Sequence, residues 1–286
     1  MVMTTAPASG RPILAPEDVD ALLVLPALEA SVAGQVCRVV RTASHTFRVP
    51  RVAEDPAASW TEEGSEIAVS DAVLDEVVIT PTKVAGLSII TNELAADSSP
   101  EAAAEVGAGL ARDIARRIDE ALFGAQAAPA PAGLASLTGV SVVTGLFGEP
   151  NDLDPFAEAA SVVEQQGASV GYWVANPADA LRLAQFKTAD GGRLPLLAVD
   201  PTQPARRIIE GRPLLVSAAV AEGTVWGIPT ERVLLVVRQD ADVVADSSPF
   251  FTSDRTAVRA TMRAGLGYVH EAAIVKITTT PADPAA

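Results

Sequence analysis

The chain has 286 residues, of which 49% are hydrophobic, and its mean hydropathy is +0.27. A chain of this length and composition can bury a core without disulfides or metal ions, so disorder of the whole chain is excluded. Lys and Arg total 21 against 36 Asp and Glu, which gives a net charge of −15 at pH 7. A surface this acidic does not collect a nucleic-acid backbone by counterion release, so general nucleic-acid binding is also excluded.

Cys37 is the only cysteine, which excludes an intramolecular disulfide and a cysteine-based zinc site. We expect it to be a small buried hydrophobic residue. The N-terminus has no basic segment followed by an apolar stretch, and no apolar run is long enough to span a membrane. We therefore expect neither a secretory signal nor a membrane partner.

The first 15 residues are small, polar and proline-containing, which is typical of an extended arm. Residues 16–26 predict a helix, because Pro16 suits its first turn and the acids after it suit the N-terminal end of the helix dipole. A short strand is expected at residues 36–40. Two longer strands are expected at residues 46–52 and 73–80.

The stretch between these two strands is the most informative part of the sequence. It carries no helix or strand pattern, and a loop of this length in a compact domain is usually functional or reaches a partner. Trp60 is its only large aromatic residue. Residues 53–76 contain no base and eight acids, which are Glu54, Asp55, Glu62, Glu63, Glu66, Asp71, Asp75 and Glu76.

Residues 83–91 predict a strand that leads into a long helix at residues 99–123. Ser98 and Ser99 are candidate N-caps, and Gly124 is a typical stop. The apolar residues of this helix recur at every fourth position; they are Val106, Leu110, Ile114, Ile118 and Leu122. Residues 126–133 are rich in alanine and proline and predict a linker at a domain boundary.

The remaining sequence alternates helix and strand patterns. Helices are expected at residues 154–166 and 176–186. Strands are expected at residues 172–175, 214–217, 225–228 and 233–237. The closing segment from Asp254 to Ile277 alternates strictly, with Arg255, Arg259 and Arg263 on one face, which is typical of a half-buried antiparallel strand.

No catalytic, cofactor-binding or metal-ligating group is found in the sequence. His45 and His270 are the only histidines, and neither has a neighbour at ligand spacing. Gly265 and Gly267 lack the third glycine of a dinucleotide-binding fingerprint. Glu62 and Glu63 stand in a polar loop, where no pocket separates the pKa values of paired carboxyl groups as catalysis requires.

Three arginines of the long helix have two interpretations. Arg112, Arg116 and Arg117 stand beside acids on the same helix, and the simpler interpretation is ion pairing along the helix surface. The alternative is that they receive the acidic loop of a neighbouring subunit.

The order of these elements resembles the major capsid protein family of tailed bacteriophages, whose fold is known as Hong Kong ninety-seven and is shared with encapsulins. The residues that carry the resemblance are SWTEEGSEIAVSDAVLDEVVITPTKVAGLSIITNELAADSS, followed by the long helix that ends in IDEALFG. LRLAQFKTADGGRLP and EGRPLLVSAAV are similar to the A-domain of that family. FFTSDRTAVRATMRAGLGYV is similar to the closing strand of its P-domain.

The resemblance implies an α+β fold with an N-terminal arm, an extended hairpin called the E-loop, and a P-domain. The P-domain has a long spine helix and long antiparallel strands, and a mixed α/β A-domain is inserted into it. The expected ranges are 1–42 for the arm, 43–82 for the E-loop, 83–136 for the P-domain, 137–245 for the A-domain, and 246–286 for the returning P-domain strands and C-terminal tail.

The function that this family implies is that of a major capsid protein, not an enzyme. It would self-assemble into pentamers and hexamers of an icosahedral virion shell that encloses double-stranded DNA without binding it tightly. Expected partners are a portal protein and a separate scaffolding protein, and a decoration protein is compatible with the sequence. The alternatives are an encapsulin-type shell that holds a cargo enzyme and, more remotely, an acidic soluble enzyme.

One departure from the family concerns covalent crosslinks between neighbours, which some relatives form from a loop lysine. The only lysines are Lys83, Lys187 and Lys276, and none lies in residues 53–76. An isopeptide crosslink from this loop is therefore excluded, and the stability of a shell must come from non-covalent contacts or from added cement proteins.

The sequence also suggests which side chains make these contacts. Because the acidic loop repels itself, we expect it to extend across an adjacent subunit with Trp60 as an apolar anchor. The expected acidic side is Glu62, Glu63 and Glu66. The expected basic side is Arg112, Arg116 and Arg117 of the helix, with Arg255, Arg259 and Arg263 of the closing strand.

Overall fold

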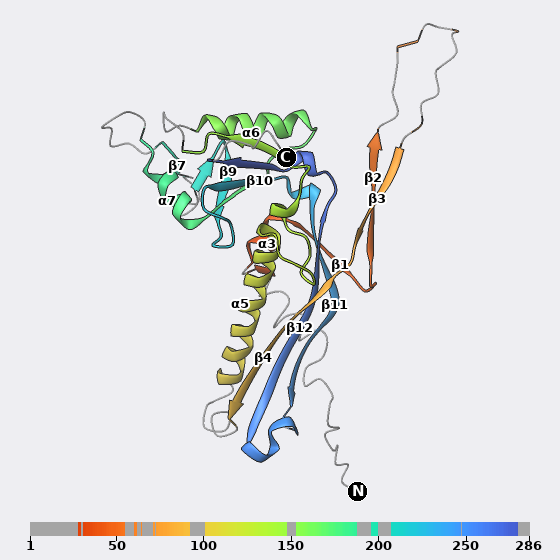
Figure 1. Ribbon diagram of the computed structural model, residues 1–286, viewed down its shortest axis with the longest axis vertical. Helices are drawn as coiled ribbons and strands as arrows, with labels where there is room; N and C mark the ends of the chain where they lie inside the picture. Colours follow the sequence, from red (N-terminus) through yellow and green to blue (C-terminus); the bar gives the residue numbers. More distant parts are fainter. Residues whose placement is uncertain are drawn as a thin grey trace.

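A computed structural model describes eleven stretches of the chain. They are residues 28–29, 31–54, 60–61, 64, 71, 73–91, 101–147, 153–187, 196–199, 207–246 and 248–279. These residues form a four-stranded sheet, a seven-stranded sheet, a two-stranded hairpin and a long helix (Figure 1). The helix expected at residues 16–26 lies outside the described residues.

The four-stranded sheet has the order β1-β11-β12-β4 and is antiparallel except for the parallel pair of β1 with β11. Its strands are β1 (Arg38–Thr42), β11 (Val233–Asp246), β12 (Arg255–Tyr268) and β4 (Thr82–Thr91). The expected strands at 83–91 and 254 onward are confirmed. The first strand begins later than expected, because Val36 ends the short helix α3 (Val32–Val36) and is buried in the core.

The long helix α5 (Glu101–Phe123) covers one face of this sheet, as the repeated apolar residues predict. Ile114, Ile118 and Leu122 are buried in the same core as Leu235 and Met262 of the sheet. The helix ends where the sequence predicts, with Gly124 directly after it. The candidate caps Ser98 and Ser99 lie outside the described residues.

The seven-stranded sheet has the order β5-β13-β10-β6-β9-β8-β7. Its strands are β5 (Ser141–Thr144), β13 (Val275–Thr278), β10 (Thr224–Ile228), β6 (Tyr172–Ala175), β9 (Arg212–Val216), β8 (Arg207–Ile209) and β7 (Ala198–Val199). Two helices accompany it, α6 (Asp154–Gln165) and α7 (Pro177–Gln185), close to the expected ranges. Phe156 of α6 packs edge-on against Trp173 of β6, with 5.1 Å between ring centroids.

Two strands of this sheet belong to both main cores. In β6, Trp173 is part of the core under α6 and α7, whereas Val174 is part of the core under α5. In β10, Val225 is part of the core under α6 and α7, whereas Trp226 is part of the core under α5. Successive strand residues point to opposite faces, so each strand ties the two cores together.

The remaining elements connect or project from these sheets. The hairpin consists of β2 (Phe47–Glu54) and β3 (Val73–Ile79), as expected from the sequence. Four short 3-10 turns complete the described chain: η2 (Leu134–Ser136), η3 (Thr230–Arg232), η4 (Ser248–Ser253) and η5 (Glu271–Ala273).

The segment at residues 126–133, expected to be a linker, is largely exposed but is held to the body at its C-terminal end. The Tyr268 hydroxyl donates a hydrogen bond to the Ala132 carbonyl over 2.9 Å, and Leu134 directly after the segment is fully buried. Alanine, proline and glycine are common in free linkers, but they also allow a chain to run close to a helix end, as happens here beside α5.

The sheets also divide the chain differently from the expected ranges. β11 begins at Val233, inside the range 137–245 assigned to the A-domain, yet it pairs along its length with β12. β13, expected among the returning P-domain strands, joins the seven-stranded sheet, and β1, expected in the arm, joins the four-stranded sheet. The charged sequence after Val237 hid the continuation of β11, which passes through an irregular register between Arg238 and Asp242.

A buried carboxylate, that of Asp119 on α5, holds the start of α3. Its Oδ1 accepts hydrogen bonds from the Ser31 hydroxyl (2.7 Å) and the Ala33 amide (2.8 Å), and its Oδ2 accepts one from the Val32 amide (3.1 Å). The Ser31 oxygen in turn accepts from the Gly34 amide, as an N-cap does. This contact ties the start of α3 to α5.

We predict that Asp119→Ala lowers the free energy of unfolding of the unassembled subunit by about 2–4 kcal/mol, because it leaves three donors without their acceptor. The measurement is urea denaturation followed by circular dichroism. Asp113→Ala is the control, since Asp113 is on the same helix but exposed, and we expect a loss below about 0.5 kcal/mol. Equal effects of the two substitutions would contradict the prediction.

A comparison of wild type with Asp119→Ala also tests how this contact depends on pH. Burial raises the pKa of Asp119 above its ordinary value of 3.8, outweighing the three hydrogen bonds, which lower it. The folded state therefore binds this proton more tightly than the unfolded chain does. The stability difference between wild type and Asp119→Ala should be largest below that ordinary value and should shrink as the pH rises through the raised pKa.

Candidate intersubunit contact surfaces

The β2–β3 hairpin projects away from both sheets and from α5 (Figure 1). Two ion pairs cross it, Arg48 to Glu76 at 2.8 Å and Arg51 to Asp75 at 2.6 Å. The hydrogen bond and charge of Arg51, with a backbone hydrogen bond, lower the pKa of Asp75. Two of the eight acids of residues 53–76 thus have partners in their own subunit. Counting charges within 53–76 alone missed these arginines, which precede that range.

The base of the hairpin rests on two glycines of β12. A Cβ atom at Gly267 would lie 2.1 Å from Cδ1 of Ile79, and one at Gly265 would lie 2.9 Å from Cγ2 of the same side chain. Ile79 is buried together with Leu234 and Val236 of β11. Gly265 and Gly267 are therefore needed for close packing of β12 against Ile79, because only a residue without a side chain leaves enough room there.

Trp60 lies in the sequence between β2 and β3 and is 107% exposed in the isolated subunit. No contact of Trp60 with the rest of the described chain buries its ring. Glu62, Glu63 and Glu66, the expected acidic contact residues, lie outside the described residues.

The face of the four-stranded sheet that lies opposite α5 is open below the hairpin base. The register places Lys83 opposite Arg263, Leu87 opposite Arg259, and Thr91 opposite Arg255. Directly opposite residues share a face, so these side chains form one surface, which we call the open sheet face. Leu87 is 64% exposed and Ile89, on the same face, is 46% exposed.

The open sheet face has more basic than acidic residues, whereas the chain as a whole has more acidic residues. Its register positions hold five basic residues, Lys83, Arg238, Arg255, Arg259 and Arg263, and two acidic residues, Asp242 and Asp246. The whole chain, in contrast, has 21 basic against 36 acidic residues. Exposed apolar side chains with flanking arginines are typical of a protein interface, where aromatic and arginine residues carry much of the binding free energy.

The helix arginines have a different environment. Arg116 pairs with Asp113 at 2.5 Å, and Arg117 pairs with Glu120 at 2.8 Å, in each case three residues apart on α5. Arg112 also has an interaction partner. The structure thus brings together the three arginines of β12 on the open sheet face, while Arg116 and Arg117 make the pairs of the simpler interpretation.

The described residues contain no arrangement typical of a metal centre. No group of three or more His, Cys, Asp or Glu among them can hold a metal ion. Cys37 is buried as expected, and burial, with the nearby charge of Asp119, raises the pKa of its thiol. No helix within the described stretches is long and apolar enough to cross a membrane.

Comparison with known proteins agrees with this architecture. A family model described as the phage capsid family matches residues 12–279, and the chain belongs to that family. It is accordingly a major capsid protein, whose place is the virion shell. A comparison with curated proteins gives no match.

Solved capsid structures show the same fold. The capsid of an empty GTA particle aligns with a TM-score of 0.73 at 18% identity, over 98% of this chain and 96% of that chain. A structure from Microbacterium phage Oxtober96 aligns with a TM-score of 0.71 at 18% identity, over 99% and 96%. One from Mycobacterium phage Bobi gives 0.68 at 17%, over 88% and 91%. The expected α+β capsid fold is confirmed, and the encapsulin alternative is not favoured.

We predict that Gly267→Ala loosens the hairpin base and lowers the free energy of unfolding by about 1–3 kcal/mol, because its methyl group overlaps Ile79. Gly109→Ala, in the open middle of α5, is the control and should not destabilise. In a double-mutant cycle, Ile79→Ala should cancel part of the cost of Gly267→Ala. Fully additive effects would show that the two residues do not touch.

Proposed function

We propose that this capsid protein acts without enzymatic activity, as a subunit of pentamers and hexamers in an icosahedral shell around double-stranded DNA. The observation that carries the proposal is a solvent-exposed tryptophan between the two strands of the hairpin, on a subunit that also has an open basic face. Neither feature serves an isolated monomer, and both serve a subunit that contacts its neighbours.

The proposed partners follow from the same family. A portal protein and a separate scaffolding protein would take part in assembly, and a decoration protein is compatible with the exposed surfaces. The net charge of −15 supports weak contact with packaged DNA, since phosphates and carboxylates repel each other.

The contact between neighbours would join the acidic loop of one subunit to the open sheet face of the next. Glu62, Glu63 and Glu66 would lie near Arg255, Arg259 and Arg263. The exposure of Arg255 and Arg259 in the subunit supports this choice. Arg112, Arg116 and Arg117 of the helix are the less favoured site, because two of them already pair on α5.

Assembly of the purified chain is the first test. We expect closed shells in negative-stain electron microscopy and a sedimentation coefficient far above that of a 29.4 kDa monomer, with the scaffolding protein added where it is required. A chain that stays monomeric at high concentration with the scaffolding protein present would overturn the proposed function.

Charge reversal tests the loop contact. We expect Glu62→Lys with Glu63→Lys to leave folding unchanged but to block assembly, because the loop would then face arginines of like charge. Adding Arg259→Glu with Arg263→Glu should restore part of the assembly. Glu158→Lys with Glu222→Lys makes the same change in net charge on exposed residues elsewhere and should assemble normally. Normal shells from the Glu62 and Glu63 variant would refute the electrostatic contact.

A further inference from the structure

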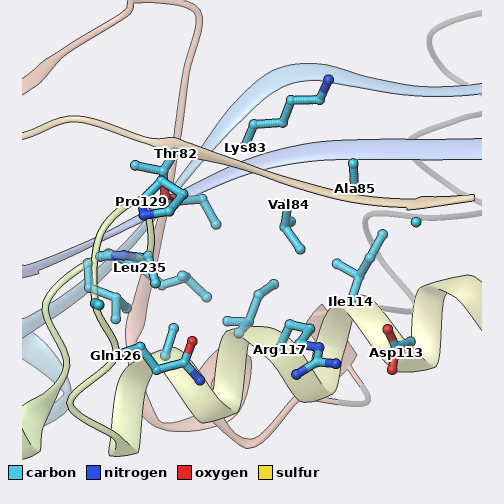
Figure 2. A pocket seen from close by; sticks show the side chains of 18 residues that line it. Thr82, Lys83, Val84, Ala85, Asp113, Ile114, Arg117, Gln126, Pro129 and Leu235 are labelled. Atoms are coloured by element: carbon cyan, nitrogen blue, oxygen red, sulfur yellow. Dashed lines mark hydrogen bonds between the residues drawn. The ribbon is translucent and has the colours of Figure 1, made fainter.

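A cavity of about 460 Å³ lies between α5 and β4, beside the segment at residues 126–131 (Figure 2). This volume is within the range of pockets that hold small ligands, about 300–1,000 Å³. Its walls are largely apolar, and Val84 of β4 and Ile114 of α5 face each other across it. Its polar lining includes Asp113, Arg117 and Gln126.

The cavity opens at the edge of the four-stranded sheet. β4 is the last strand of that sheet, so no strand among the described stretches lies beyond it on this side. Lys83 also lines the cavity, but its side chain points from β4 to the opposite side of the strand, onto the open sheet face (Figure 2). A segment that crosses the edge of β4 can therefore touch the cavity and the basic face together.

Among the described residues, Trp60 is the most exposed large hydrophobic side chain, and we assign it to the cavity. It is fully exposed, whereas Trp173 and Trp226 are 0% and 2% exposed and belong to the cores. It is also the only aromatic residue of residues 53–76. The hairpin that carries it points away from α5 of its own subunit (Figure 1), so the Trp60 that reaches the cavity comes from a second copy.

The lining supplies what a buried indole and its neighbours need. An indole N–H usually finds an acceptor when it is buried, and the oxygens of Asp113 and Gln126 lie in the lining. Glu62 and Glu63 follow Trp60 in the sequence, and Lys83, which lines the cavity and stands on the open sheet face, offers them a positive charge.

We propose that Trp60 of one subunit inserts into the α5–β4 cavity of a neighbouring subunit. The inference rests on the proposed function of the hairpin as an intersubunit contact, and it names the site on the neighbouring subunit that the hairpin reaches. In this arrangement the acids after Trp60 pass the edge of β4 toward the arginines of the open sheet face.

Tryptophan fluorescence gives the first measurement, because the other two tryptophans are already buried. On assembly of the full chain, the emission should shift to shorter wavelength, and acrylamide quenching should fall several-fold. Trp60→Phe should abolish both changes. A Trp60 that is quenched equally in shells and in free subunits would overturn the insertion.

A matched pair of variants then tests the cavity itself. Ala127 lines the cavity, and Ala125, two residues earlier in the chain and also exposed, does not line it. Ala127→Phe should raise the protein concentration needed for assembly about tenfold or more, as for loss of an anchor residue, and Ala125→Phe should leave it within about twofold. Equal effects of the two variants would refute the cavity as the site.

Cysteine crosslinking keeps the test decisive if Ala127→Phe fails to fold. The only native cysteine, Cys37, is buried, so paired variants can be read without interference. In assembled shells, Thr61→Cys should crosslink between subunits with Gln126→Cys and not with Leu87→Cys. The reverse pattern would place Trp60 on the open sheet face and overturn the cavity. Absence of shells in wild type would instead refute the proposed function.

Discussion

The structure depends on the two faces of β12. One face carries Ala260, Met262 and Ala264, whose small or flexible side chains let α5 pack close to the sheet. The other face carries glycines at its upper end, where the hairpin base rests, and arginines below them. A single strand of alternating residues thus positions the core helix, the projecting hairpin and the basic surface relative to one another.

Elements with a long, regular apolar pattern were predictable from the sequence. The repeat at every fourth residue identified α5, and the strict alternation after Asp254 identified β12. The continuation of β11 past Val237 was not predictable, because its pattern breaks at Arg238 and charged residues follow. Its strand structure there depends on pairing with β12, a tertiary interaction that no local pattern encodes.

The candidate site was only partly predictable for a related reason. The alternation of Arg255, Arg259 and Arg263 indicated a shared face, and the structure brings them together with Lys83 of another strand. In contrast, Asp119 stands among charged residues that look alike in the sequence. It is buried only because α3, far upstream in the chain, lies against it, and neither that contact nor the α5–β4 cavity leaves a signal in the residues nearby.

The two strands that belong to both cores, β6 and β10, have a consequence for shell geometry. A subunit that occupies both pentamers and hexamers must meet slightly different neighbour angles with one sequence, the problem of quasi-equivalence. Because β6 and β10 place alternate side chains in each core, the two sheets cannot swing against each other without breaking both. The hairpin, attached through Ile79 and a few half-buried neighbours, is the joint with the lowest resistance to bending. We therefore expect the angular differences between positions in the shell to be absorbed at the hairpin base, while the two sheets keep one arrangement.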